Sequence, residues 1–421
     1  MADGSEAAIG RGRDALRRGL WSAARELFGQ ALARVESVDA YEGLGIAARY
    51  QLDADAALAA HEQGYRLARA AGDPITAARL AVQLGYDAYS FRGPAEAQGW
   101  VERAIMLLEG QPPCVAAATI PVMQAHLALL ADHDPDRALQ LCERGLGLAR
   151  EVGAVDVEML ALALAGLTRV SVGEIDDGMR RLDAATAAAL GGEMVDADAI
   201  ETVCCYMMDA CRRVRDLPRA REWSVRATEI TQRYDDRQMF AVCRTYYGEV
   251  LMWCGQWGDA EIELTAAAEE LATVRPGRDD DALVRLAELR RRQGRTSEAR
   301  TLLAGARSHP LHPLVDGRLA LDRGDARAAL DAATNYLRAV GKQDRFERVA
   351  GLELAIRAAV ACGDPIAAEA AAELAATAQA SPTLPLRAAA ELAMGRVAAA
   401  DGRLEDARDR FETAGALLAR A

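Results

Sequence analysis

Apolar residues recur along the chain at the spacing of paired helices, and small residues hold fixed places in that pattern. The clearest unit begins at Gly248, with a second glycine seven residues later at Gly255, followed by Ala260, Leu264 and Ala267. A small residue lets two helices cross closely, and glycine in the turn between them permits a positive φ. Because alternating runs of β-branched and aromatic residues are missing, the pattern predicts helix pairs and no sheet strand.

The same unit repeats along the whole chain, mostly at intervals of 39 to 42 residues. A small residue stands twelve places after each first position. This spacing is similar to that of tetratricopeptide repeats, with a longer unit, so we expect an all-α, right-handed α-solenoid of about eleven helix–turn–helix repeats. The first positions are Gly12, Gly45, Gly85, His126, Gly166, Met208, Gly248, Ala287, Gly317, Ile356 and Gly395. The small positions are Ala24, Ala57, Ala97, Ala138, Gly178, Ala220, Ala260, Ala299, Ala329, Ala368 and Ala407.

The repeat is least regular in its third quarter. The polar stretch 275–281 interrupts the pattern, and a shortened interval follows it. We expect a single solenoid over residues 1–421. Any bend or division should fall at 272–316 and would separate 1–271 from 317–421.

Composition and charge exclude several classes of protein. A net charge of −13 would repel a phosphate backbone, so we expect no direct nucleic-acid contact by this segment. The first ten residues carry two acids and no basic cluster, which does not resemble a signal peptide. The longest apolar run, residues 159–167, is about half of the ~20 residues that a membrane span needs. These features predict a soluble, cytoplasmic protein that does not enter a membrane.

The eight cysteines are scattered without a CxxC pair. Cys204 and Cys211 lie two helical turns apart, with Cys205 beside them, which would suit a redox or metal cluster. The alternative is that all three fill small positions in a tight helix pair, as reduced thiols do in a cytoplasmic protein. We expect the second arrangement.

No residue pattern points to catalysis. We find no nucleophile beside a base and no paired acids, and the motif of His309 and His312 has no further ligand at helical spacing. We therefore expect no enzyme activity, no catalytic residue, no cofactor and no metal site.

The repeat register does predict a binding groove. In such arrays the first helix of each pair lines the concave face, and fixed places around its first position point into that groove. Aromatic and arginine side chains, the usual anchors of a binding site, gather at those places. A peptide, a partner helix or an amphipathic small molecule would suit such a groove, although Trp253 and the tyrosines would also fit between neighbouring helices. The candidate groove residues are Tyr50, Tyr86, Tyr89, Met123, Asp209, Arg212, Arg213, Thr245, Glu249, Met252, Trp253, Glu288, Arg291 and Arg292.

Three stretches carry a resemblance to a known family. They are 88–93, which reads AYSFRG; 203–216, which reads VCCYMMDACRRVRD; and 240–261, which is followed after an interval by LVRLAELRRRQGRTSEA from Leu283. The chain resembles the helical-repeat region of large LuxR-type bacterial transcriptional regulators. That resemblance implies a regulatory or sensor domain that binds a protein or small-molecule effector in the groove. DNA binding would belong to a separate C-terminal domain.

The chain departs from that family at two motifs. No LTxREREVL-like segment of a helix-turn-helix domain follows the repeats, and no GxxxxGK[ST] phosphate-binding loop is present. We therefore expect neither of those domains in this chain. The alternative is a stand-alone scaffold for protein assembly. It would include a homodimer through the amphipathic C-terminal repeat, because repeat arrays expose apolar faces unless they are capped.

Overall fold

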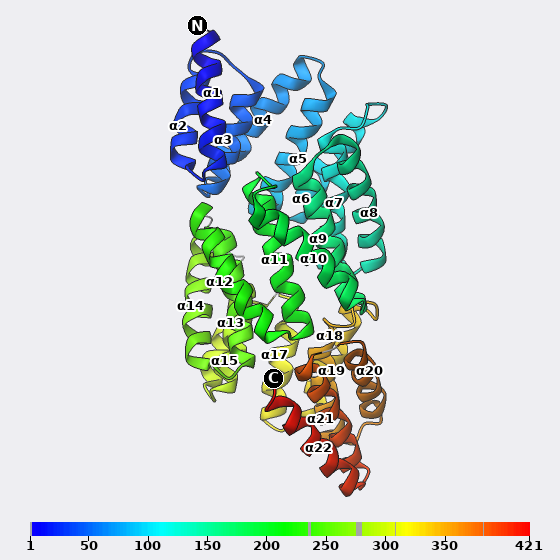
Figure 1. The fold of residues 1–421 in the computed structure, drawn as a ribbon. Coiled ribbons are helices and arrows are strands. Elements are labelled where there is room, and N and C mark those ends of the chain that lie inside the picture. Colours follow the sequence, from blue (N-terminus) through cyan, green and yellow to red (C-terminus); the bar gives the residue numbers. More distant parts are fainter. Residues whose placement is uncertain (1, 235–236, 275–279, 308, 382) are drawn as a thin grey trace.

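The computed structural model describes residues 2–234, 237–274, 280–307, 309–381 and 383–421, and this part of the chain contains 22 helices and no strand (Figure 1). Each repeat forms one pair of consecutive helices, so the predicted all-α solenoid of eleven repeats is confirmed. The helices are α1 (Ala2–Arg17), α2 (Trp21–Leu32), α3 (Val38–Tyr50), α4 (Ala54–Ala70), α5 (Pro74–Phe91), α6 (Pro94–Leu108), α7 (Val115–Leu130), α8 (Pro135–Val152), α9 (Val155–Val172), α10 (Ile175–Gly191), α11 (Ala197–Val214), α12 (Leu217–Tyr234), α13 (Arg237–Trp253), α14 (Trp257–Val274), α15 (Asp280–Arg292), α16 (Thr296–Gly305), α17 (His312–Asp322), α18 (Ala326–Val340), α19 (Val349–Cys362), α20 (Ile366–Ala380), α21 (Leu384–Ala400) and α22 (Leu404–Leu418).

The small residues stand where the two helices of a pair cross. All first positions lie on odd-numbered helices, and all small positions lie on even-numbered ones. In the fifth repeat, a Cβ added to Gly166 would lie 2.7 Å from the carbonyl oxygen of Gly178 in the facing helix. That distance is too short for a real contact, so both glycines are required for this crossing.

One predicted small position is wrong by a residue. In the tenth repeat Ala368 is exposed, and Ala367 is the buried residue. The reason is local, because Pro365 directly precedes α20 and the Ala367 N–H donates to the Asp364 carbonyl oxygen. Because α20 starts in this way, Ala367 takes the buried place that the small residue twelve positions after the first position has in the other repeats.

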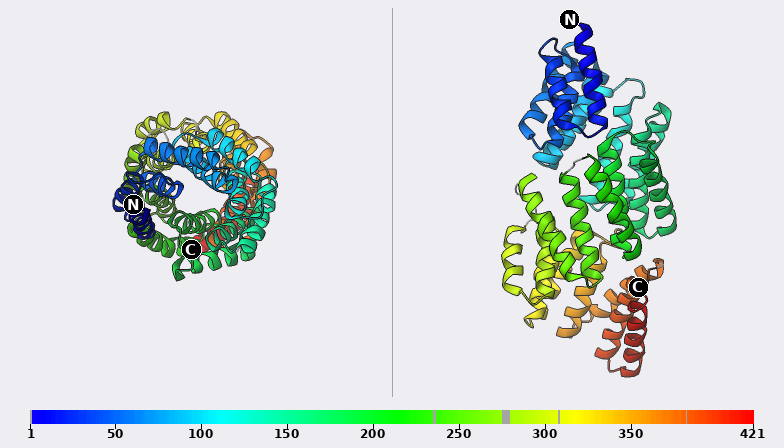
Figure 2. Two further views of the ribbon diagram at one scale, coloured as in Figure 1. Left: turned by 90° about the horizontal axis from the view of Figure 1, so that it is seen from above. Right: turned by 60° about the vertical axis from the view of Figure 1, so that its left-hand side comes forward.

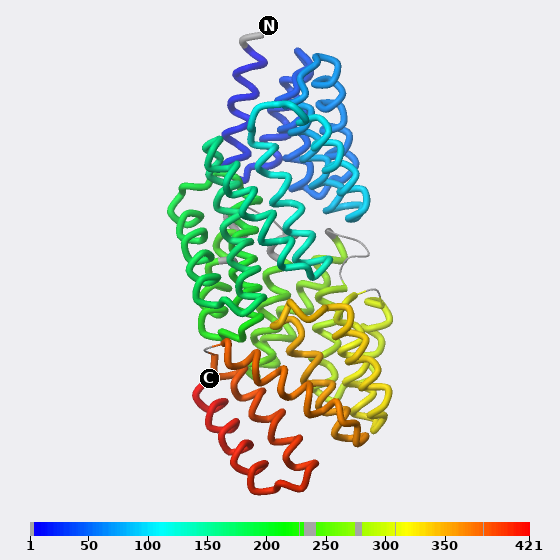
Figure 3. Tube along the Cα trace, turned by 90° about the vertical axis from the view of Figure 1, so that its right-hand side faces the viewer, coloured from blue at the N-terminus to red at the C-terminus, as the bar shows by residue number. Residues whose placement is uncertain are grey.

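The repeats wind around a common axis, and successive turns of this superhelix stack on each other (Figures 1 and 2). The odd-numbered helices of successive repeats contact each other directly, as α9 does with α11 and α11 with α13. They therefore form the inner row, which we call the concave face. The tube drawing shows the C-terminal helices directly below the middle of the chain (Figure 3).

Contacts between turns join residues far apart in sequence. The Arg345 N–H donates to the Ser171 carbonyl oxygen at 3.1 Å, and the Thr383 hydroxyl donates to the Val214 carbonyl oxygen at 2.5 Å. The largest buried cluster likewise combines Leu164 of α9 with Leu352 of α19. Since one apolar core is shared by two turns, burial of apolar surface holds the superhelix closed.

The predicted junction at 272–316 includes the short helices α15 and α16, with 13 and 10 residues, and the start of α17, with 11 residues. Residues 275–279 and 308 of this stretch lie outside the described residues. Leu303 of α16 and Leu319 of α17 share one buried cluster. A division of the solenoid here stays a prediction. Within the described chain, no helix has the length and apolarity that a membrane crossing requires.

Candidate ligand-binding site on the concave face

The candidate tyrosines near the N-terminus lie between neighbouring helices. Tyr50 stacks on Trp21, with ring centroids 3.7 Å apart and planes 5° apart. The guanidinium of Arg49 lies 5.8 Å from the ring centre of Tyr86, and it also pairs with Asp198 of α11 at 3.3 Å. The pair of Arg49 and Asp198 therefore joins the first turn of the superhelix to its second.

The next two candidates also pack against other helices. The Tyr89 hydroxyl lies 3.4 Å from Nε2 of His126, whose Nδ1 lies 2.6 Å from the Tyr206 hydroxyl. Burial lowers the pKa of His126 to about 4, so the ring is neutral at physiological pH. Met123 packs against the apolar cluster of α5 to α7.

The candidates on α11 belong to a buried ion network. Arg213 donates to Asp209 at 2.8 Å and to Asp344 at 2.9 Å, and Arg212 pairs with Glu347 at 3.0 Å. Burial alone would raise the pKa of Asp209, but the charges of Arg212 and Arg213 lower it below its usual range. Because Asp344 stands 131 residues after Arg213, and Glu347 stands 135 residues after Arg212, the network ties two turns together.

Four candidates on α13 complete this region. Glu249 accepts a hydrogen bond from Arg285 at 2.6 Å, Thr245 is fully buried, and Met252 packs in an apolar cluster. Trp253 lies under the guanidinium of Arg215, which is 5.4 Å from the ring centre.

Arg215 holds an unusual backbone conformation. It ends α11 with φ at +55°, a region that residues other than glycine seldom adopt. From there both of its terminal nitrogens donate to the carboxylate of Glu353 on α19, each at 2.9 Å. This bidentate pair is a second tie between the turns.

The last three candidates lie together in a pocket. Glu288, Arg291 and Arg292 of α15 line a cavity of about 200 Å³ on the concave face, between the inner helices of the last four repeats. The other helices supply mainly cations and small apolar side chains. The remaining lining residues are Arg318, Glu353, Leu354, Ile356, Arg357, Ala389, Leu392, Ala393 and Arg396.

Positive charge dominates this pocket, which has five arginines and two carboxylates among its lining residues. Glu353 is already paired with Arg215, outside the pocket lining. Glu288 is shared by three arginines, at 2.9 Å from Arg291, 2.8 Å from Arg292 and 3.4 Å from Arg318. Those cations, with Arg318 having the largest effect, lower the pKa of Glu288 far below its usual range although burial opposes them.

Two arginines of the pocket have no such partner. Over the described ranges of the chain, neither Arg357 nor Arg396 makes a hydrogen bond or an ion pair. Burial lowers the pKa of the Arg357 guanidinium, and the neighbouring charges of Arg396 and Arg291 lower it further. A half-buried cation among like charges is unfavourable, so an anion placed here would gain electrostatic energy.

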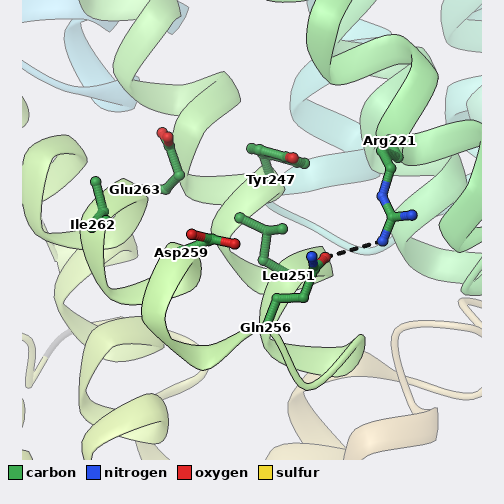
Figure 4. A pocket seen from close by; sticks show the side chains of 7 residues that line it. All are labelled: Arg221, Tyr247, Leu251, Gln256, Asp259, Ile262 and Glu263. Atoms are coloured by element: carbon green, nitrogen blue, oxygen red, sulfur yellow. Dashed lines mark hydrogen bonds between the residues drawn. The ribbon is translucent and has the colours of Figure 1, made fainter.

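A second hollow, on the outer side, is larger but less suited to a ligand (Figure 4). It measures about 420 Å³ and lies between α12, α13 and α14. Arg221, the cation among its lining residues, donates to the Gln256 side chain at 3.0 Å. Glu263 on its wall is paired with Arg244. Arg221 and Glu263 therefore each have a polar partner within the chain.

Neither the protein-family models nor the curated proteins contain a match to this sequence. Among solved structures, the chain is similar to a Rap protein complexed with competence and sporulation factor, at 10% identity over 100% of this chain and 99% of the other, with a TM-score of 0.48. It is also similar to human IFIT1 in a dimer with m7Gppp-AAAA, at 12% identity over 99% and 95%, with a TM-score of 0.48. Yeast Tom70 follows at 14% identity over 98% and 92%, with a TM-score of 0.37. At such identities the likeness concerns the helical-repeat fold alone.

Sequence reasoning missed the arginines that matter most in the pocket. Arg318, Arg357 and Arg396 each directly follow the first position of their repeat, in the last three repeats of the chain. Glu288 stands at the same place in the repeat before them. The recurrence of arginine at one inward-facing place was the signal that could have found them.

Proposed function

We propose that this chain is the effector-binding part of a LuxR-type transcriptional regulator, and that it works by binding rather than by catalysis. The effector occupies the arginine-lined pocket between α15, α17, α19 and α21. The observation that carries the proposal is the pair of arginines, Arg357 and Arg396, that face this pocket without a partner. The resemblance of residues 203–216 and 240–261 to LuxR-type regulators supports the assignment to that class.

Binding in this pocket has a route to the rest of the molecule. Glu353 lines the pocket and pairs with Arg215, the residue that ends α11. An effector that shifts the balance of charge around Glu353 changes the contact between two turns of the superhelix. A neighbouring output domain would sense that change as altered curvature.

Native mass spectrometry of gently purified protein tests the binding step. We expect a monomer that carries a defined extra mass, and we expect this mass to be absent from the variant with Arg357→Gln and Arg396→Gln. The matched control changes Arg300→Gln and Arg408→Gln, two exposed arginines on outer helices, and it should retain the mass. A wild-type protein without any extra mass, or equal retention in both variants, would contradict the proposal.

The assignment to a regulator has its own test. The coding frame beyond residue 421 should encode a helix-turn-helix domain. A stop codon at that place, without an adjoining regulator gene, would argue against this part of the proposal and leave the binding step intact.

A second candidate function is self-association as a scaffold. The last helix, α22, exposes Leu404 at 70% and Leu418 at 51%, with Phe411 between them at 39%. A second copy of the chain would bury this apolar face. Sedimentation should then show a dimer that the variant with Leu404→Glu and Leu418→Glu abolishes, whereas a concentration-independent monomer would exclude it.

A further inference from the structure

The pocket on the concave face selects among anions by its charge and geometry. We propose that the group bound there is the phosphoryl group of a small phosphate ester, held between Arg357 and Arg396. This inference rests on the proposed function and specifies the chemical class of the effector.

The charge of the pocket calls for more than one negative charge. Its lining has three more arginines than carboxylates, from five cations and two anions. From outside the lining, Arg215 pairs with the anion Glu353, and Asp322 pairs with the cation Arg291 at 2.6 Å, so an excess of three positive charges remains. A carboxylate ligand would supply a single charge, whereas a phosphate monoester supplies about 1.5 to 2 at neutral pH.

The donors of the pocket also match a phosphoryl group. A guanidinium offers N–H groups in a planar fork that binds two oxygens at once. Two arginines without partners therefore present two forks, and a carboxylate has only two oxygens to share between them. A terminal phosphoryl group has three acceptor oxygens, so it can accept from both forks together.

The remaining walls limit the size and polarity of the ligand. Leu354, Ile356, Ala389, Leu392 and Ala393 form the apolar side of the cavity. A volume of about 200 Å³ lies below the usual range for drug-sized ligands, which begins at about 300 Å³. The ligand is therefore a small ester whose phosphoryl group faces the arginines and whose short organic part faces the apolar wall.

Other clusters in the molecule do not offer this combination. The ion network around Arg213 is buried, and its guanidinium already contacts two carboxylates. The Sγ atoms of Cys205 and Cys243 lie 3.3 Å apart, but both thiols are buried, and burial raises the pKa of Cys204 beside them. Among the pockets and clusters named here, all within the described residues, the concave pocket combines open volume with unpaired cations.

Titration calorimetry with inorganic phosphate tests the inference on ligand-free protein at about pH 8, where phosphate carries close to two charges. Acetate serves as the carboxylate probe at equal ionic strength. We expect phosphate to bind at least tenfold more tightly than acetate. The variant with Arg357→Gln and Arg396→Gln should lose roughly tenfold or more of the phosphate affinity, because charge-assisted hydrogen bonds are lost.

Two further variants make the result specific. Arg357→Lys keeps the charge but loses the planar fork, so its phosphate affinity should fall between those of the wild type and the double variant. The variant with Arg300→Gln and Arg408→Gln has the same net charge as the double pocket variant and should bind phosphate like the wild type. Circular dichroism confirms that each variant is folded, and the comparison of phosphate with acetate needs the wild type alone.

Three outcomes would overturn the inference: no phosphate binding by the wild type, equal affinity for phosphate and acetate, or equal weakening in the control variant. These outcomes are distinguishable from failure of the proposed function. If native mass spectrometry finds an effector that depends on Arg357 and Arg396 while phosphate does not bind, the pocket binds another class of molecule. If no effector is found but phosphate binds selectively, the site is real and the regulatory role fails.

Discussion

Replacing Arg213 with alanine should open the contact between two turns of the superhelix. This side chain is only 3% exposed, and it contacts Asp209 at 2.8 Å, Asp344 at 2.9 Å and the Ser171 hydroxyl at 3.1 Å. Asp344 has no exposed side-chain surface. Removing the cation would leave Asp344 without its main partner and Asp209 with one of its two arginines.

The expected cost lies near the lower end for a broken buried ion pair. Removal of one partner from such a pair typically costs about 3–5 kcal/mol. Here each carboxylate keeps a second contact, because Arg212 lies 2.7 Å from Asp209 and His133 lies 3.4 Å from Asp344. We therefore expect the free energy of opening to fall by about 3 kcal/mol, which corresponds to exchange roughly a hundredfold faster.

Hydrogen exchange is the appropriate assay, since long repeat arrays need not unfold in one step. The peptide that covers residues 343–353 should lose protection in Arg213→Ala, while peptides from α21 and α22 keep theirs. Scattering measurements should also give a larger radius of gyration. The control is Arg180→Ala, because Arg180 is 72% exposed and its ion pair with Asp177 contributes at most about 1 kcal/mol.

A double-mutant cycle with Asp344→Ala separates the ion pair from other effects of truncation. A coupling energy above about 1 kcal/mol is expected for two buried residues in direct contact. Unchanged exchange in residues 343–353, or a coupling energy near zero, would refute the view that this ion network holds the turns together.

The other predictions concern single positions. Burial holds the pKa of His126 at about 4, below the usual 6.5. Between these two pH values the imidazole takes up a proton in the unfolded chain but not in the folded one, so the free energy of unfolding should fall by up to about 3 kcal/mol as the pH is lowered. The variant His126→Gln should lack this pH dependence in denaturation experiments. Gly166→Ala should lower the free energy of unfolding by about 1–3 kcal/mol, because the added Cβ would lie 2.7 Å from a carbonyl oxygen. Gly147→Ala should raise it by about 0.5–1 kcal/mol, because a Cβ added there has nothing within 4 Å. Urea denaturation measures both changes. Arg357→Gln should raise the free energy of unfolding by less than about 1 kcal/mol in the absence of ligand, and high salt should reduce that gain.

The helix pairs could be predicted from the sequence because each depends on contacts within one repeat. Gly166 and Gly178 are only twelve residues apart, so the crossing that needs them both appears as a local pattern. The error at Ala368 is also local. A fixed spacing of twelve residues does not take account of a proline directly before the helix, as Pro365 is before α20.

The closure of the superhelix could not be predicted in the same way. The contact of Arg213 with Asp344 depends on the small rotations between repeats added over several units, and a single repeat does not encode their sum. For that reason the sequence could assign Asp209 and Arg213 to the concave face, but it could not show that their side chains belong to a buried ion network. Arg291 and Arg292 lie in the open pocket, because the concave face remains accessible at the last four repeats.

The pocket and the closure share one residue, and this makes them electrostatically dependent on each other. Glu353 is a wall of the pocket and the bidentate partner of Arg215, which lies 138 residues earlier. A bound dianion would repel Glu353 and so weaken its pair with Arg215, which is a contact between turns. At the same time it would neutralise Arg357 and Arg396, which have no partner. By linkage, if a bound anion weakens the pair of Arg215 and Glu353, then loss of that pair changes the anion affinity by the same coupling free energy. Arg215→Gln should therefore change phosphate affinity although its side chain is no part of the pocket lining, and an unchanged affinity would mean that the two features act independently.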